Sequence, residues 1–570
     1  MRYLALATDY DGTLAHDGVV PEAAVDALRR LRDTGRKLIM VTGRELDQLM
    51  DVFPELDLFD WVVAENGPLL YRPSDRTEVL LGPEPDEEFV RMLRDRGVAP
   101  LSVGRIIVAT VEPNEKVVLQ TIHDLGLELQ VIFNKGAVMV LPSGMNKATG
   151  LLHVLRDLGL SPHNVVGVGD AENDHAFLGL CEASVAVANA LVTLQERCDH
   201  VTDGARGHGV RELIDEIIDS DLADLSPRLN RHHIPLGTDG DGRRVALDPH
   251  GSVVLLAAPS GSGKSTLATA FVEGLSDTAY QFCLIDPEGD YETFEGAVVL
   301  GDPDRPPSAD EVMQLLEDPT DNAVVNLTGL SLHDRPGFFT ELLPRLQKLR
   351  AQAGRPHWIV IDEAHHLLPA SRDGPAESTL PMDLGGTLMI TVHPERIAPT
   401  ALHAVTDVLT VGDAPRETVS AFAASIGQDP PGMEAGALDP GHALRWSPDG
   451  GHPVVFRMAE PRVERRRHRR KYAAGELVSE EHFVFTGPDG KLNLRAQNLM
   501  IFLQMADGVD DDTWTFHLRR GEYSRWFRRM IKDQDLAAKA EKVEQDDTLA
   551  PEESRTRIRE AVEEGYTLPA

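Results

Sequence analysis

Two acidic residues near the start of the chain have the spacing of a cation-binding pair. Asp9 and Asp11 follow the apolar segment Tyr3–Thr8 directly, and Gly12 comes next. In an open parallel sheet, ligands bind beyond the carboxyl ends of the strands. Two carboxylates just past such an end can share one cation, and a glycine lets the backbone turn sharply away from it. The pattern predicts a cation site at a strand end.

Two further predicted strands end in groups that complement this pair. The strand 37–41 leads into Thr42, which offers a hydroxyl and a backbone N–H to an anion. The strand 165–168 leads into the acidic run 169–174, Gly-Asp-Ala-Glu-Asn-Asp, and Lys147 opens a helix before it. Because the carboxyl ends of parallel strands share one edge of a sheet, we expect carboxylates, a hydroxyl and an ammonium group to meet there.

Together these segments resemble the haloacid dehalogenase superfamily, specifically its Cof-type phosphatases, over about residues 1–218. The sequences DYDGT, VTGR and GDAEND and the single lysine are similar to the four motifs of that family, and AENG at 64–67 is similar to this branch. The resemblance implies a Mg²⁺-dependent phosphomonoester hydrolase. Asp9 would be the nucleophile that forms an aspartyl-phosphate, and Asp11 would protonate the leaving oxygen and then activate water. The metal-binding residues implied by the resemblance are Asp9, Asp11 through its carbonyl, Asp170 and, in support, Asp174; the phosphoryl-binding residues are Thr42, Gly43, Lys147 and Asn173.

The residues between the second and third motifs, about 71–142, resemble the cap domain that closes over the substrate in this family. The pattern predicts helices at 86–96 and 114–125 and strands at 105–111, 129–133 and 137–141. The cap is short, and its sequence does not select one phosphomonoester.

A second set of residues has the pattern of a nucleotide site. The apolar segment Val253–Ala257 is followed by the glycine-rich run 258–266, APSGSGKST, and by a predicted helix. This is a Walker A loop with alanine in place of its first glycine: its backbone N–H groups hold phosphates, Lys264 reaches the β- and γ-phosphates, and Ser265 binds Mg²⁺. The ATP-binding residues predicted from this loop are Ser260, Gly261, Ser262, Gly263, Lys264, Ser265 and Thr266.

The strand 358–361 ends in Asp362 and Glu363, as a Walker B strand does. Asp362 would support Mg²⁺, and Glu363 would polarise the attacking water. The runs 284–291 (LIDPEGDY), 362–368 (DEAHHLL) and 388–391 (LMIT) resemble the HerA/FtsK-type P-loop ATPases, which act as hexameric motors, often on DNA. The chain departs from that family after residue 391, where Val-His-Pro replaces the usual glutamine.

The elements that position these residues alternate between apolar strands and amphipathic helices, which predicts parallel sheets. We expect an α/β fold with two doubly wound three-layer domains, a Rossmannoid with a small cap and a RecA-like P-loop domain, plus a small, mainly helical C-terminal module. The predicted boundaries are 1–218 for the phosphatase domain, 219–233 for a linker, 234–460 for the ATPase domain, 461–480 for a basic linker, 481–540 for the helical module and 541–570 for a disordered tail.

Composition limits the classes of protein further. The 570 residues are 42% hydrophobic and 26% charged, which excludes disorder of the whole chain. With 56 basic and 92 acidic residues the net charge is −36, so the general surface does not suit nucleic acid or anionic membranes. No apolar run reaches the ~18 residues of a membrane span, and the N-terminus does not have the pattern of a signal peptide. Three cysteines outside any CxxC spacing make a disulfide framework or zinc-thiolate site improbable. We expect a cytoplasmic protein without membrane contact.

The basic run Arg465–Lys471 is the exception to this acidity. It could bind a nucleic-acid backbone, dock on an acidic face of the same protein, or be a solvated linker.

The sequence favours a phosphomonoester hydrolase fused to an ATP-hydrolysing domain, with Mg²⁺ and ATP as cofactors, a phosphorylated small molecule as substrate and a homo-oligomer, a hexamer, as the assembly. One alternative is a kinase–phosphatase that acts on polynucleotide ends or on a sugar. The other is a nucleotide-gated scaffold or sensor.

Overall fold

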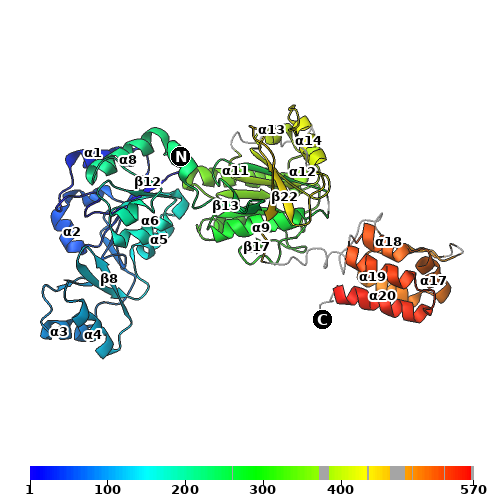
Figure 1. Ribbon diagram of the computed structural model, residues 1–570, viewed down its shortest axis with the longest axis horizontal. Coiled ribbons are helices and arrows are strands. Elements are labelled where there is room, and N and C mark those ends of the chain that lie inside the picture. Colours follow the sequence, from blue (N-terminus) through cyan, green and yellow to red (C-terminus); the bar gives the residue numbers. More distant parts are fainter. Residues whose placement is uncertain are drawn as a thin grey trace. The chain divides into compact units, whose positions relative to one another are not determined.

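The computed structural model describes residues 1–259, 261–370, 384–432, 436–462, 482–488, 490, 492–531 and 533–565. Of the sequence-based predictions, those for Ser260 and for the run Arg465–Lys471 lie outside these residues. The chain divides into two compact units, Met1–Pro259 with Ala270–Ala459 and Ser260–Thr269 with Glu460–Ala570. Figure 1 labels the helices and strands along the chain. Within the described residues, no helix is long and apolar enough to cross a membrane.

The N-terminal part of the first unit is built on an eight-stranded sheet of order β12-β11-β10-β1-β2-β3-β4-β5. The strands are β1 (Ala5–Thr8), β2 (Lys37–Val41), β3 (Trp61–Ala64), β4 (Leu69–Arg72), β5 (Thr77–Leu80), β10 (Val165–Gly169), β11 (Ala183–Ala186) and β12 (His200–Val201). The strands from β12 to β3 are parallel, and β4 and β5 continue the sheet antiparallel. This α/β arrangement confirms the fold class predicted for the N-terminal domain.

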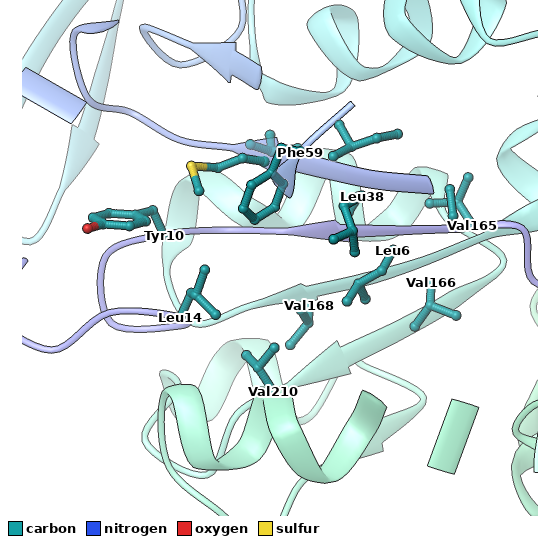
Figure 2. Close-up of a cluster of buried hydrophobic side chains, with 14 of the residues drawn as sticks. Leu6, Tyr10, Leu14, Leu38, Phe59, Val165, Val166, Val168 and Val210 are labelled. Carbon is teal, nitrogen blue, oxygen red and sulfur yellow. The ribbon is translucent and has the colours of Figure 1, made fainter. Parts of the chain in front are cut away.

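The central strands of this sheet are apolar throughout because both faces of a parallel sheet are covered. β1, β3 and β10 are buried at every position. The helices of this domain are α1 (Glu22–Asp33), α2 (Leu46–Val52), α5 (Lys147–Asp157), α6 (His175–Leu180), α7 (Val192–Gln195) and α8 (Gly207–Ser220). Figure 2 shows Leu6 of β1, Val168 of β10 and Val210 of α8 in one buried cluster.

The cap has a core of its own. A four-stranded antiparallel sheet of order β6-β7-β9-β8 packs with α3 (Glu87–Asp95) and α4 (Glu115–Leu125) around Phe89, Leu93 and Val118. Its strands are β6 (Ser102–Val103), β7 (Val108–Val111), β8 (Leu129–Asn134) and β9 (Ala137–Pro142). β4 and β5 pair with the main sheet, so the cap begins later than the predicted residue 71.

The second part of this unit contains an eleven-stranded sheet of order β14-β13-β23-β22-β21-β15-β20-β19-β16-β18-β17. The parallel strands are β15 (Val253–Ala257), β16 (Phe282–Asp286), β17 (Val298–Leu300), β18 (Ala323–Asn326), β19 (Trp358–Ile361), β20 (Thr387–Thr391) and β21 (Asp407–Val411), and the antiparallel ones are β13 (Ile234–Asp239), β14 (Arg244–Leu247), β22 (His442–Trp446) and β23 (Val454–Met458). The helices are α9 (Lys264–Asp277), of which residues 264–269 are counted with the second unit, α10 (Ala309–Leu315), α11 (Arg335–Ala353), α12 (Ala364–Leu367), α13 (Pro399–Leu402) and α14 (Pro415–Ser425).

The C-terminal part of the second unit is mainly helical, as predicted. It contains α16 (Leu499–Gly508), α17 (Asp511–Arg519), α18 (Glu522–Arg529), α19 (Gln534–Glu544) and α20 (Pro551–Gly565), with a short hairpin of β24 (Phe483–Phe485) and β25 (Leu494–Ala496). Its aromatic residues form the core: Trp514, Tyr523 and Phe527 are fully buried.

Within the predicted disordered tail 541–570, residues Pro551–Gly565 form α20. Ile558 and Val562 on this helix are buried in the C-terminal core, and the indole N–H of Trp514 donates to the Ser554 hydroxyl at 2.9 Å. Helix α20 is highly charged, which suggested disorder, but its few apolar residues recur on one face and are enough to dock it.

Candidate active site

Three carboxylates meet at the carboxyl edge of the N-terminal sheet. β1 and β10 are adjacent and parallel, so Asp9 and Asp170 come directly after neighbouring strand ends. One carboxylate oxygen each of Asp9, Asp170 and Asp174 lies within 4.8 Å of the others, and all three residues are buried. The structure thus brings together residues that are up to 165 positions apart in the sequence.

The close approach of the loop after β1 to the Asp170 carboxylate requires glycine at position 12. Its φ is +85°, and a Cβ at this position would lie 2.3 Å from the Asp170 carboxylate. Any side chain would therefore displace Asp170.

Lys147 is the cation at the centre of the cluster. It is the first residue of α5, whose N-terminus is capped by the Asn146 side chain accepting from the Thr149 N–H. Its ammonium group donates to Asp9 and to Asp174, both at 2.6 Å. Although burial alone would lower the pKa of Lys147, the two carboxylates outweigh it and raise that pKa, so the lysine stays charged.

Positive charge within the cluster does not balance the acids. Burial, followed by repulsion from Asp174, raises the pKa of Asp9 to about 7 against the opposing effect of Lys147. Burial also raises the pKa of Asp170. A buried group of carboxylate oxygens that holds surplus negative charge fits a divalent cation such as Mg²⁺, a hard ion that prefers oxygen ligands.

Asp174 also organises the loop after β10. Its second oxygen accepts from the backbone N–H groups of Asp170 and Ala171, both at 2.9 Å. These bonds fix the position of Asp170 relative to the strand end.

The predicted phosphoryl-binding residues lie on the loops next to this cluster. Thr42 follows β2, is buried, and accepts from the Arg44 N–H at 3.1 Å. The Asn173 amide donates to Asn66 at 3.0 Å and lies against Gly43, where an added Cβ would be 3.7 Å from its nitrogen.

Asp11 is bound by an arginine whose role the sequence did not predict. The Arg44 guanidinium donates to both carboxylate oxygens of Asp11, at 2.5 and 2.7 Å. This two-point contact fixes the orientation of the carboxylate.

The contacts of two further residues were not predicted, because they join distant segments of the chain. Glu65, at φ 53°, is fully buried and accepts from the backbone N–H groups of Arg105, Ile106 and Ile107 at 2.7–2.9 Å, which ties the cap to the main domain. Lys135, in the turn between β8 and β9 of the cap, donates to Asp170 at 2.6 Å. In sequence, Lys135-Gly136 has only the pattern of a hairpin turn.

In the second sheet the predicted Walker B residues also lie at a strand end. Asp362 is buried directly after β19, and Glu363 lies 3.5 Å from the His365 ring. That ring contacts the Thr391 hydroxyl, at the end of the neighbouring β20, at 3.1 Å. Lys264 is the first residue of α9, which follows β15 after the glycine-rich loop.

Comparison with known proteins assigns the first domain. A family model described as haloacid dehalogenase-like hydrolase matches residues 6–96 and 101–214. "Phosphoglycolate phosphatase 2" of Saccharolobus solfataricus is 30% identical over 221 residues, covering 38% of this chain and 92% of that protein. "Phosphoglycolate phosphatase" of Methanothermobacter thermautotrophicus is 32% identical over 220 residues, covering 37% of this chain and 96% of that protein. A haloacid dehalogenase-like hydrolase from Bacteroides thetaiotaomicron has a solved structure that covers 38% of this chain and 99% of its own, with 18% identity and a TM-score of 0.34.

The chain therefore belongs, through its N-terminal domain, to the haloacid dehalogenase-like hydrolases. The predicted membership of this family is confirmed for about the first 220 residues. The family model ends at residue 214, so the second sheet and the helical module receive no assignment from it.

Proposed function

We propose that the N-terminal domain hydrolyses a small phosphomonoester whose leaving group carries a carboxylate, as phosphoglycolate does. The observation that carries this proposal is the buried Asp9–Lys147–Asp174 contact beside Asp170. The two relatives named as phosphoglycolate phosphatases support the substrate class.

In this mechanism a carboxylate oxygen of Asp9 attacks phosphorus, and the bond to the leaving oxygen breaks. Lys147 holds the attacking group in place through its 2.6 Å contact and offsets the negative charge of the phosphoryl group. Asp11 gives a proton to the leaving oxygen, and the carboxylate that results then takes a proton from the water that attacks the aspartyl-phosphate. Arg44 orients the Asp11 carboxylate for both steps through its two contacts. Mg²⁺ held by Asp9, Asp170 and the Asp11 carbonyl, with Asp174 in support, would neutralise charge on the phosphoryl oxygens.

Lys135 accounts for the carboxylate preference. Its ammonium group lies on the cap yet reaches Asp170 at 2.6 Å, so it is a cation at the border between the cap and the site. A substrate carboxylate can take it as a partner, whereas a neutral leaving group cannot.

Two variants test this proposal. Asp9→Asn should abolish turnover of both 2-phosphoglycolate and p-nitrophenyl phosphate, since both need the nucleophile. Lys135→Met should raise KM for 2-phosphoglycolate about tenfold or more, the value of one charge-assisted hydrogen bond, with little change for p-nitrophenyl phosphate. Activity retained by the Asp9 variant would refute the mechanism, and an equal effect of the Lys135 variant on both substrates would refute only the substrate class.

We further propose that residues 234–460 bind and hydrolyse ATP. Strand order supports this, since β15, β20, β19 and β16 are consecutive and parallel. Their carboxyl ends therefore lie along one edge, where Thr391, Asp362 and Asp286 are found. Burial, with repulsion from Asp290 and Asp362, raises the pKa of Asp286 to about 7, so this edge concentrates negative charge that a magnesium–nucleotide complex would relieve.

The roles within this site follow from the Walker patterns. Backbone N–H groups of residues 260–266 and the Lys264 ammonium would bind the phosphates, Ser265 and Asp362 would hold Mg²⁺, and Glu363 would orient the attacking water. The resemblance to HerA/FtsK-type ATPases makes an ATP-dependent hexamer the assembly to test, with Arg465–Lys471 as the candidate contact for nucleic acid.

Glu363 distinguishes this function from its alternatives. Glu363→Ala should bind ATP nearly normally but release phosphate at least about a hundredfold more slowly, as expected for loss of a group that positions water. Transfer of labelled γ-phosphate to 5′-hydroxyl DNA or to a sugar, with little free phosphate, would identify a kinase instead. ATP binding without hydrolysis or transfer by the unaltered chain would favour the scaffold or sensor. Light scattering of Glu363→Gln with ATP tests for the hexamer.

A further inference from the structure

The C-terminal helical module contains a cavity of about 460 Å³ that no function has yet been given. Residues from the end of α17, from α18 and from the end of α19 line it. Figure 1 labels these three helices. Its volume falls within the range of small-molecule sites. Five of its lining residues are arginines, in a chain whose net charge is −36: Arg519, Arg520, Arg525, Arg528 and Arg529.

Three of these arginines are ion-paired within the module. Their partners are Asp547 for Arg519, Glu522 for Arg520 and Glu541 for Arg528, each at 2.7 Å. Arg525 and Arg529 differ: both are exposed, and neither has a carboxylate partner among the residues that the structure describes. Guanidinium groups gathered at one cavity repel each other unless an anion lies between them, and their planar donors suit phosphate oxygens.

A buried carboxylate in the same cavity wall points to a second feature of the ligand. Glu544 is only 8% exposed, and one of its oxygens accepts from the Ser524 N–H at 2.9 Å. The other oxygen, Oε2, has no hydrogen-bond partner in the described part of the chain and lies beside Gly521, which also lines the cavity. A buried acceptor without a donor is costly, and a hydroxyl group would satisfy it.

From these two observations we propose that the cavity binds a small molecule that carries at least two phosphate groups and a hydroxyl. The phosphates contact Arg525 and Arg529, and the hydroxyl donates to Glu544. Sugar bisphosphates and nucleotides share this chemistry. Because this site lies in the helical module, the proposal is independent of the phosphatase and ATPase sites.

The test is calorimetric titration of the full chain. Asp9→Asn and Lys264→Ala are included as background changes, so that neither the phosphatase site nor the glycine-rich loop contributes. The probes are fructose 1,6-bisphosphate, ADP and inorganic tripolyphosphate, which has no carbon-bound hydroxyl. We expect fructose 1,6-bisphosphate or ADP to bind. The probe with the lower Kd shows whether the ligand is a sugar bisphosphate or a nucleotide.

Variants of the cavity then assign the contacts. Arg525→Ala with Arg529→Ala should weaken binding about a hundredfold, roughly tenfold for each charge-assisted contact. Replacing both by lysine should recover part of this loss, because charge is kept but the planar donor pair is not. Arg557→Ala, an ion-paired arginine of α20 outside the cavity, is the matched control and should have no effect. Glu544→Ala should weaken binding of the hydroxyl-bearing probe but leave tripolyphosphate unchanged.

Three outcomes would overturn the proposal. One is that no probe binds; another is that Arg557→Ala weakens binding as much as the cavity variants do. The third is that only a 5′-phosphorylated oligonucleotide binds through Arg525 and Arg529, which would make the surface a nucleic-acid contact. Far-UV circular dichroism shows whether each variant is folded.

Discussion

Glu65→Ala should release the cap from the main domain. The Glu65 carboxylate accepts three backbone N–H groups of the cap, and those of Ile106 and Ile107 are buried. Alanine leaves both buried donors without a partner. At about 1–3 kcal/mol for each unsatisfied group, the local cost is about 2–6 kcal/mol.

Amide hydrogen exchange measures this cost directly. Exchange of Ile106 and Ile107 reports the free energy of local opening, and one decade in rate corresponds to about 1.4 kcal/mol. The variant should therefore exchange at these amides at least about thirtyfold faster than the unaltered chain. Turnover of 2-phosphoglycolate should fall with it, because the cap carries Lys135.

Asp47→Ala is the matched control. Asp47 also binds Arg105, but through the exposed guanidinium, and a surface ion pair of this kind contributes only ~0–1 kcal/mol. Exchange at Ile106 and Ile107 should change about fivefold at most. The reasoning would be refuted if Glu65→Ala left exchange within about threefold of the unaltered chain, or if both variants had equal effects.

Four further predictions concern the N-terminal site and the C-terminal module. Lys147→Met leaves two buried carboxylates without their ammonium partner and should destabilise the N-terminal domain by about 3–5 kcal/mol. Calorimetry would show this as a lower unfolding temperature. The control Lys37→Ala breaks an exposed pair with Asp60 and should have a minor effect. Chelation by EDTA should lower phosphatase turnover at least about a hundredfold, and added Mg²⁺ should restore it; turnover that survives EDTA would argue against the metal assignment. Arg44→Ala should lower kcat with little change in KM. Acid–base catalysis contributes about 10²–10⁴-fold to the rate, and the loss in kcat should be part of that factor. An unchanged kcat would show that Asp11 needs no orientation. Removal of residues 550–570 should expose Trp514 and shift its fluorescence to longer wavelength; an unshifted spectrum would mean that α20 adds nothing to the core.

The sequence by itself determined which residues enter the N-terminal site. Asp9, Asp170 and Lys147 belong to short motifs at strand ends, and a parallel sheet brings such ends to one edge whatever the intervening loops do. The α/β class could be predicted for the same reason, because strand and helix periodicities are local properties of the chain.

Only the tertiary structure decided the contacts between segments that are far apart. Lys135 meets Asp170 across 35 residues, and Glu65 meets Arg105 across 40. Lys135 has no sequence signal beyond that of a hairpin turn, and although Glu65 belongs to the run AENG, nothing in that run indicates its contact with the cap. The docking of α20 was decided in the same way, since its charged sequence gains stability only from the apolar surface that the rest of the module offers. Local patterns thus specified which side chains meet at the strand ends, and long-range packing specified the contacts that hold them there.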